Sequence, residues 1–321
     1  MNILVTGVSG FIGFSLSKYI LELSNKHKIY GIDSLNSYYS QKLKKKRTNI
    51  LKKYKNFKFK KLDISNKSKI NNYLKKIKLD LVINLAAQAG VRYSLSNPEE
   101  YVYSNQLGFF NILDYCRKFD VKLIYASSSS VYGDAKKFPT KEINELNPKN
   151  IYSATKLGNE IFAEIFFKFY KLKVIGLRFF TVYGEWGRPD MFILKYLETA
   201  HKKKKFVYYN KGNYVRDFTY IHDVIKLIHP LIFSKNKIFE KHEIYNVCSN
   251  RPIKVSKVYE KLNKIIKNKN LLNVKKNKLD SYKTHGSNKK ILSFSKLFKF
   301  TKFDDALIKT YKWYKKFAHL I

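Results

Sequence analysis

The sequence predicts an α/β fold in which a doubly wound parallel sheet carries helices on both faces. Short apolar runs alternate with longer amphipathic stretches through the first 180 residues, and a glycine-rich turn follows the first apolar run. Such alternation forms βαβ units, whose right-handed crossovers place helices on both faces of the sheet. The expected strands are 2–6, 28–33, 57–61, 81–85, 121–126 and 173–178, and the expected helices between them are 11–24, 41–53, 66–77, 98–118 and 149–171.

The remainder of the chain is less regular and indicates a second, smaller unit. Helical patterns recur near 189–202, 221–233, 255–267 and 303–317. We expect one domain from 1–180 plus about 213–247, with strand order 3-2-1-4-5-6 and further strands added to it. A smaller C-terminal substrate-binding domain would comprise 181–212 plus about 248–321. The functional site of such a sheet lies at the carboxyl ends of its strands, here between the two domains.

The chain is strongly basic, with 64 Lys and Arg against 24 Asp and Glu and a net charge of +40. Such a charge would attract nucleic acid, an anionic membrane or a small anionic substrate. However, the Lys excess accompanies many Asn, Ile, Tyr and Phe, as an AT-rich coding sequence would give, and the Lys runs are scattered. We therefore expect no nucleic-acid partner, although an anionic substrate would gain in encounter rate.

The cysteines and the short apolar runs indicate in which compartment we expect the protein. Cys116 and Cys248 belong to no CxxC or Cys/His cluster, so the sequence indicates neither a disulfide framework nor a metal site. No stretch approaches the ~18 apolar residues that read as a membrane span, and no basic lead-in precedes the first apolar run. We expect a cytoplasmic protein without a membrane partner.

A glycine motif, Gly7-Val8-Ser9-Gly10-Phe11-Ile12-Gly13, joins the first expected strand to the first helix. Glycine permits the tight turn and a close approach of the backbone to a pyrophosphate, and the helix N-terminus offers N–H groups to it. Asp33 ends the second strand, where a carboxylate binds the adenosine ribose diol and repels a 2′-phosphate. The pattern predicts a Rossmann-type domain that binds NAD rather than NADP.

Two further stretches fall where such a fold contacts its dinucleotide. Asp63-Ile64 ends the third strand, beside the expected adenine position. Ala86-Ala87 follows the fourth strand and offers small side chains beside the coenzyme. A plain strand-end Asp remains an alternative for Asp63.

Tyr152 and Lys156 form a YxxxK pattern on the long helix expected at 149–171. The spacing of four residues places both side chains on one helix face. A tyrosine with its ordinary pKa near ~10 is a poor base at neutral pH, but a nearby ammonium stabilises the phenolate. The pair therefore predicts a general base for a sugar hydroxyl, with a solvated helix face as the alternative.

A serine run, Ser127 to Ser130, follows the fifth strand and leads into Val131-Tyr132-Gly133. A hydroxyl at a strand end beside the coenzyme can share a hydrogen bond with the oxygen that Tyr152 deprotonates. A polar loop is the alternative.

These motifs together resemble extended short-chain dehydrogenases that act on nucleotide sugars, over almost the full length of the chain. The resemblance implies that Ser128 is the catalytic hydroxyl, beside Tyr152 and Lys156, and that the substrate is a UDP-sugar. Arg92 and Ser129 are further expected substrate contacts.

Three stretches resemble the UDP-glucuronate 4-epimerases within that family: 86–94, 177–191 and 216–220. This resemblance implies that Thr181 and Arg188 hold the sugar carboxylate and that Arg216 meets the UDP diphosphate. Arginine binds carboxylate or phosphate in bidentate geometry, which suits both roles. The alternatives are a surface position for Arg188 and an ion pair with Asp217 for Arg216.

The expected activity is the NAD-dependent 4-epimerisation of UDP-glucuronate to UDP-galacturonate. An epimerase of a neutral or N-acetylated UDP-sugar is the main alternative. A 4,6-dehydratase would need an acid and a base directly after the catalytic hydroxyl, where Ser129 and Ser130 stand. A non-catalytic nucleic-acid-binding module is the remaining alternative. The family resemblance further implies a homodimer formed through the helices at 98–118 and 149–171.

Overall fold

A computed structural model describes residues 1–321 except 235, 268–271, 277–280 and 296. Its centre is a seven-stranded sheet in which every neighbouring pair is parallel. In spatial order the strands are β3 (Phe57–Lys61), β2 (Lys28–Asp33), β1 (Asn2–Thr6), β4 (Leu81–Asn84), β5 (Lys122–Ser128), β6 (Val174–Phe179) and β10 (Glu243–Val247). The predicted order 3-2-1-4-5-6 is confirmed, and β10 adds a seventh strand beside β6.

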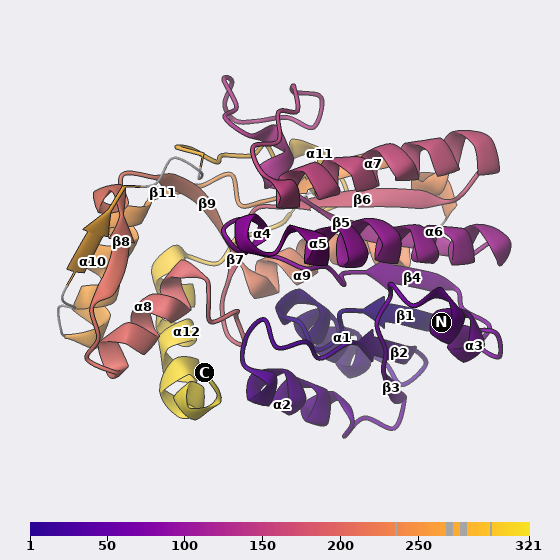
Figure 1. The fold of residues 1–321 in the computed structure, drawn as a ribbon, viewed down its shortest axis with the longest axis horizontal. Coiled ribbons are helices and arrows are strands. Elements are labelled where there is room, and N and C mark those ends of the chain that lie inside the picture. Colours follow the sequence, from indigo (N-terminus) through magenta and orange to yellow (C-terminus); the bar gives the residue numbers. More distant parts are fainter. Residues whose placement is uncertain (235, 268–271, 277–280, 296) are drawn as a thin grey trace.

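Both faces of this sheet are covered by helices (Figure 1). Consecutive strand residues point to opposite faces, so Ile3 and Val5 enter one apolar cluster while Leu4 enters another. The first cluster includes α1 (Phe11–Leu23), α2 (Gln41–Leu51) and α9 (Ile221–Phe233). The second includes α3 (Lys67–Leu74), α6 (Gly108–Lys118) and α7 (Ile151–Tyr170). The nearly continuous apolar character of the strands follows from burial on both sides.

A smaller lobe lies beside the carboxyl ends of the strands, at the left of Figure 1. It contains a three-stranded sheet of β7 (Thr181–Tyr183), β9 (Val215–Tyr220) and β11 (Pro252–Lys254), and a pair of β8 (Phe206–Tyr209) with β12 (Leu272–Lys275). Its helices are α8 (Phe192–His201), α10 (Val255–Ile266) and α12 (Phe303–Phe317). The predicted division at 181–212 and 248–321 stays a prediction, and residues 268–271, 277–280 and 296 of the second segment lie outside the described residues.

The remaining helices are short. They are α4 (Tyr93–Ser96), α5 (Pro98–Tyr101), α11 (Lys289–Leu292) and 3-10 turns at 129–132, 210–212, 236–239 and 318–320. No helix in the described part of the chain is long and apolar enough to cross a membrane.

The helix expected at 98–118 is not regular. Its middle is a π-helical turn, Val102–Leu107, between α5 and α6. Within that turn Asn105 donates to the hydroxyl of Thr155 (3.0 Å), and Gln106 donates to the backbone oxygen of Thr155 (2.6 Å). These bonds fix the wider turn to the first half of α7. Turns of this kind are frequent at functional sites.

Candidate active site

A cavity of about 410 Å³ opens at the carboxyl ends of the strands, next to the β1–β4 boundary where the strand order reverses. The predicted residues that line it are Gly7, Gly10, Phe11, Ile12, Gly13, Asp33, Asp63, Ile64, Ala86, Ala87, Ser128, Ser129, Tyr152, Lys156, Thr181, Arg188 and Arg216. Arg92 lines an adjoining cavity of about 250 Å³, which shares Thr181, Arg188 and Arg216 with the first.

The glycine loop is too tight for any side chain at two positions. Gly7 has φ +66°, and a Cβ there would lie 2.8 Å from the backbone nitrogen of Ala86. A Cβ on Gly13 would lie 2.3 Å from the carbonyl oxygen of Gly7. Helix α1 begins after Gly10 without a side-chain cap, so its first amides remain available to an anion at the cavity wall.

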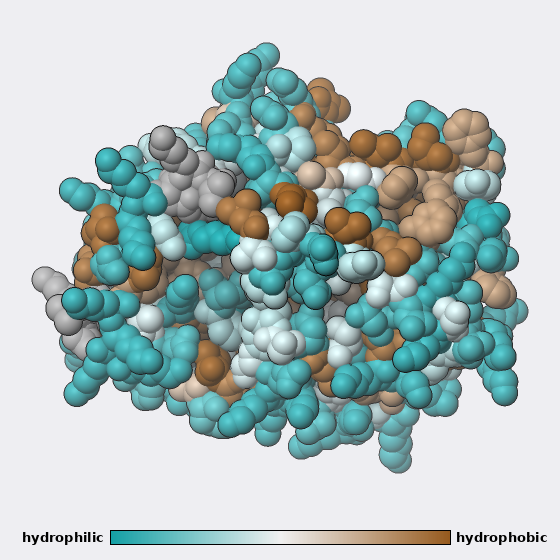
Figure 2. Space-filling view, viewed as in Figure 1, coloured by the Kyte–Doolittle hydropathy of each residue, from teal (hydrophilic) through white to brown (hydrophobic). Residues whose placement is uncertain are grey.

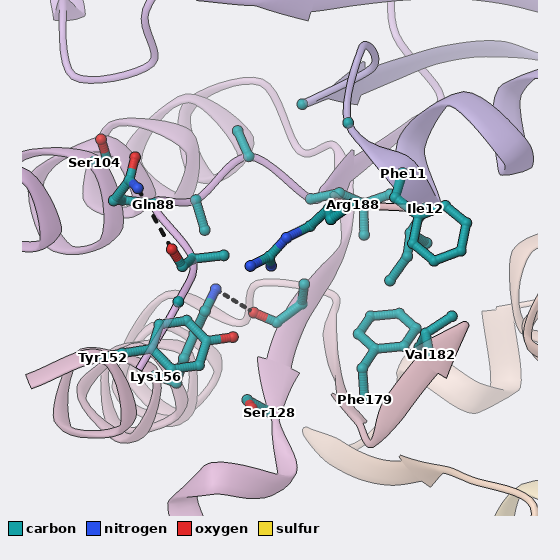
Figure 3. A pocket seen from close by; sticks show the side chains of 18 of the residues that line it. Phe11, Ile12, Gln88, Ser104, Ser128, Tyr152, Lys156, Phe179, Val182 and Arg188 are labelled. Carbon is teal, nitrogen blue, oxygen red and sulfur yellow. Dashed lines mark hydrogen bonds between the residues drawn. The ribbon is translucent and has the colours of Figure 1, made fainter. Parts of the chain in front are cut away.

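Tyr152 stands in the first turn of α7, which a capping box fixes. Asn150 accepts from the backbone nitrogen of Ser153 (2.9 Å), and Ser153 accepts from that of Asn150 (3.1 Å). One turn later Lys156 donates to the carbonyl oxygen of Ala126, two residues before the end of β5 (2.9 Å). Helix and strand are therefore joined at the point where Tyr152 and Lys156 enter the cavity (Figure 3).

The pKa of Tyr152 is shifted upward, whereas the sequence predicts a downward shift caused by Lys156. Burial raises it above the ordinary tyrosine value, while a hydrogen bond with Ser128 and the charge of Arg188 lower it. Burial also lowers the pKa of Lys156 to about 8, which the charge of Glu160 partly opposes. Desolvation thus outweighs the expected help from Lys156, and Ser128 and Arg188 are the groups that favour the phenolate.

The hydroxyls of the serine run lie in two different environments, one buried beside Glu160 and one at the cavity. Strand β5 continues to Ser128, two residues beyond its expected end, so Ser127 and Ser128 point in opposite directions. Ser127 donates to the buried carboxylate of Glu160. Ser128 accepts from the hydroxyl of Ser130 (2.9 Å) and faces the cavity. The structure therefore brings Ser128, and not Ser127, beside Tyr152.

The smaller lobe and its connections contribute three predicted residues to the cleft: Thr181, Arg188 and Arg216. Thr181 begins β7, and Arg216 lies on β9 with its guanidinium over the ring of Tyr214 (5.0 Å). The neighbouring Asp217 accepts instead from the hydroxyl of Ser249 (2.7 Å). Adjacent strand residues point to opposite faces, which explains why Arg216 lines the cavity while Asp217 is buried behind it.

Arg92 is exposed and stacks its guanidinium over the ring of Tyr209 at 3.8 Å. It therefore contributes to the adjoining cavity and not to the one that holds Tyr152 and Lys156. Arg188 is no free surface residue, because its side chain is only 21% exposed and forms an ion pair with Asp190.

Comparison with known proteins agrees with this arrangement. The sequence profile of the NAD dependent epimerase/dehydratase family matches residues 3–248. A UDP-glucuronate 4-epimerase of Thermodesulfobacterium geofontis is 37% identical over 269 residues, which is 82% of this chain and 80% of that protein. Protein CapI of Staphylococcus aureus is 40% identical over 297 residues, covering 87% and 86% of the two chains.

Among solved structures, UDP-glucuronic acid 4-epimerase of Bacillus cereus, in complex with UDP-glucuronic acid and NAD, superposes with a TM-score of 0.90. It is 28% identical, and the match covers 98% of this chain and 99% of that one. The chain belongs to the NAD dependent epimerase/dehydratase family. It is therefore an enzyme with NAD as its coenzyme, as the glycine motif and Asp33 predict.

The residues at the cleft fit the coenzyme of this family. Asp33 is anchored by the backbone nitrogens of Ser9 (3.0 Å) and Leu35 (2.8 Å), and burial raises the pKa of its carboxyl. Asp63 is exposed and accepts from the backbone nitrogen of Ser65 (2.8 Å), beside the buried Ile64. Asp33 would hold the ribose diol, and α1 would face the pyrophosphate; these roles stay predictions.

Gly13→Ala should abolish tight NAD binding. The added methyl group would meet the carbonyl oxygen of Gly7 at 2.3 Å, so the loop must shift away from its present path. We expect bound NAD, measured after denaturing the purified protein, to fall at least tenfold below wild type. Lys18→Ala is the control on the same helix, because it changes a surface side chain that pairs with Glu22. Equal NAD content in both variants would contradict this assignment.

Several residues at the site escaped sequence reasoning. Lys44 is buried on α2 and donates to the side-chain oxygen of Asn36 (2.6 Å), and both line the cavity with Tyr38. Burial lowers the pKa of Lys44 to about 8. In a segment with this many cations, nothing in the sequence distinguishes the buried lysine from its exposed neighbours.

A buried ion pair behind the serine run was also not predicted from the sequence. Glu160 receives bonds from Nε (2.9 Å) and Nη2 (2.7 Å) of Arg178, and both side chains are below 5% exposed. Arg178 also donates to the hydroxyl of Tyr132 (2.7 Å), which donates to Asn246 (2.7 Å). The pair therefore joins α7, β6 and β10 directly beneath Ser127. The sequence did offer one indication of this pair: Glu160 stands four residues after Lys156, on the same face of the helix.

Proposed function

We propose that this enzyme interconverts UDP-glucuronate and UDP-galacturonate by 4-epimerisation through a transient 4-keto sugar. The observation that carries the proposal is the convergence of Tyr152, Ser128, Lys156 and Arg188 on one cavity (Figure 3). The first three are suited to remove a hydroxyl proton, and the fourth is suited to hold a sugar carboxylate. The named relatives above support the same substrate.

In this proposal Tyr152 takes the proton of the C4 hydroxyl, while Ser128 donates a hydrogen bond to the same oxygen. Lys156 holds Tyr152 in place through the junction with Ala126 and is available to the nicotinamide ribose. The glycine loop and Asp33 would hold NAD, which would supply the acceptor and then the donor of the C4 hydride. Tyr152 returns its proton to the same oxygen after the sugar has turned. The configuration at C4 inverts because the hydride is returned to the opposite face of the flat carbonyl carbon, and no net oxidation occurs.

The 4-keto form of a uronic acid is a β-keto acid, which readily loses CO₂. Decarboxylation requires the bond to the carboxylate to stand roughly perpendicular to the carbonyl plane. Arg188 and Thr181 would hold the carboxylate away from that angle. The nucleotide would occupy the adjoining cavity, whose walls are rich in aromatic side chains and include Arg92 and Arg216.

Incubation of the purified enzyme with UDP-glucuronate tests the function directly. We expect UDP-galacturonate to form with only traces of UDP-pentose. Arg188→Ala should lower kcat/KM at least about tenfold, the order of a charge-assisted hydrogen bond, and should raise the UDP-pentose fraction. Arg251→Ala is the control for loss of a cation outside the cleft lining. Unchanged uronate turnover and pentose fraction in Arg188→Ala would remove the carboxylate-holding role.

The alternatives are less well supported. A neutral UDP-hexose would leave Arg188 without an anion, and a dehydratase would lack its acid–base pair because Ser129 and Ser130 occupy that place. Nucleic-acid binding would explain the charge of +40 but not the convergence of Tyr152, Lys156 and Ser128. Faster conversion of UDP-galactose than of UDP-glucuronate would favour the neutral substrate.

We further propose a homodimer through α6 and α7. Figure 2 shows apolar side chains gathered over this region. They lie on α4 to α7 and are at least 38% exposed: Leu95, Val102, Tyr103, Leu107, Phe110, Ile161, Phe162, Ile165, Phe169 and Tyr170. An apolar face of this extent is typical of an obligate interface between like subunits. A cytoplasmic location and a role in polysaccharide synthesis are part of the proposal, the former in keeping with two buried free thiols.

Ile165→Glu combined with Phe169→Glu should convert the dimer to a monomer, because two charges would be buried without partners. Light scattering on the eluted protein would measure the mass. Ile143→Asp, which alters a 91% exposed side chain away from these helices, should leave the dimer intact. A monomeric wild type would contradict the proposal.

A further inference from the structure

Arg188 is held by one edge of its guanidinium. Its Nε donates to Oδ1 of Asp190 (3.0 Å), and its Nη2 donates to Oδ2 (2.5 Å). A guanidinium presents two edges that can each take a carboxylate, one formed by Nε with Nη2 and the other by the two Nη groups. Asp190 occupies the first. The second edge points into the cavity toward Tyr152 and Lys156 (Figure 3).

Asp190 is itself fixed from the opposite domain. The hydroxyl of Tyr38, which follows β2, donates to Oδ2 of Asp190 (3.0 Å). Tyr38 is packed on two sides. Its hydroxyl lies 2.1 Å from the position that a Cβ on Gly90 would take, and its ring centroid is 4.7 Å from that of Tyr93. Burial raises the pKa of Asp190, but Arg188 outweighs it and lowers the pKa overall, so the carboxylate stays ionised.

The backbone that carries Arg188 is held separately. Arg47 is fully buried on α2, and its guanidinium donates to the carbonyl oxygens of Trp186 (2.5 Å), Gly187 (2.8 Å) and Ser9 (2.9 Å). These bonds fix the loop before Arg188 to the glycine loop. They leave the direction of the Arg188 side chain to its bonds with Asp190 and to the ring of Tyr38, over which the guanidinium lies at 5.8 Å. Tyr38→Phe would keep that ring and remove only the hydroxyl.

We propose that Asp190, held by Tyr38, is a positioning residue that turns the open edge of Arg188 toward the carboxylate of the sugar. The inference rests on the proposed function and extends it, since it assigns substrate selection to two residues that do not themselves hold the sugar. Asp190 also repels any carboxylate that approaches the occupied edge, so an acidic sugar is accepted in one orientation only. That orientation keeps the carboxylate from the angle at which CO₂ is lost.

Three variants test the role: Asp190→Asn, Tyr38→Phe and the double variant. For each, kcat and KM are measured with UDP-glucuronate and with UDP-galactose, together with the UDP-pentose fraction and the bound NAD. Asp190→Asn should lower kcat with UDP-glucuronate about tenfold or more, because misplaced groups reduce the rate of a positioned reaction. It should raise the pentose fraction and leave turnover of UDP-galactose unchanged.

Tyr38→Phe should change the same quantities in the same direction by a smaller factor. If Tyr38 acts through Asp190, the double variant should match Asp190→Asn alone, since coupled residues are not additive. Asp304→Asn is the matched control, because it removes a carboxylate from a surface pair with Lys261 away from the cleft. Normal NAD content in Tyr38→Phe excludes a folding defect.

The outcomes separate the two proposals. If wild type interconverts the uronates while Asp190→Asn keeps its rate and pentose fraction, the positioning role is wrong and the function stands. Equal losses for uronate and neutral sugar, or additive effects in the double variant, also overturn the role. If wild type converts UDP-galactose but not UDP-glucuronate, both proposals are wrong.

Discussion

Tyr152→Phe should reduce the interconversion of UDP-glucuronate and UDP-galacturonate by about 10²–10⁴-fold, the usual contribution of a positioned general base. The ring remains, so its packing against Tyr101 (6.2 Å between centroids) and the fold should persist. Steady-state rates with UDP-glucuronate would measure the loss, and the bound NAD should equal that of wild type. Because only the hydroxyl is removed, KM should change far less than kcat.

Tyr54→Phe is the matched control, since it removes an exposed hydroxyl that donates to Glu22. It should retain full activity. A Tyr152→Phe enzyme with more than a tenth of the wild-type rate would rule out this tyrosine as the base.

The dependence of kcat on pH tests the role of Tyr152 independently. Activity should rise with pH as Tyr152 loses its proton, because the phenolate is the active form. The hydrogen bond from Ser128 lowers the pKa of Tyr152, so its loss in Ser128→Ala raises that pKa. The rising limb of the profile should therefore move to higher pH, in addition to any loss of rate.

Glu160→Gln should destabilise the enzyme by about 3–5 kcal/mol, the cost of removing one partner of a buried ion pair. Arg178 would keep its charge at 3% exposure, and the amide nitrogen of Gln, which is a donor, would replace one of the two oxygens that accept from it. The shift of the urea unfolding midpoint, multiplied by the slope of the transition, would measure the loss. Activity should fall as well, because this pair lies beneath the strand end that carries Ser128.

Glu22→Gln serves as the comparison, because Glu22 pairs with Lys18 on the exposed surface of α1. Such a pair contributes at most about 1 kcal/mol. Similar unfolding midpoints for the two variants would show that the buried Glu160–Arg178 pair contributes no more to the free energy of unfolding than the surface pair.

Some parts of the cleft could be predicted from the sequence and others could not. The glycine motif, Asp33 and the Tyr152–Lys156 spacing are readable because each depends on backbone geometry within one βα unit or one helix. Periodicity placed the strands and most of the helices, and the strand order 3-2-1-4-5-6 followed from the Rossmann-type fold that the glycine motif indicates. The π turn at 102–107 was not predicted, because it depends on side-chain bonds from Asn105 and Gln106 to a helix about 50 residues away.

The sequence by itself determined the parallel sheet, the dinucleotide loop and the helix that carries Tyr152, because local spacing and apolar periodicity specify them. Only the tertiary structure decided which cations are buried and where Arg188 points. Lys44 and Arg47 are indistinguishable from the exposed lysines around them until α2 packs against the glycine loop and the loop at 184–188. Partners so far apart in the chain meet only after folding, so the charge that each side chain faces is a property of the packed molecule.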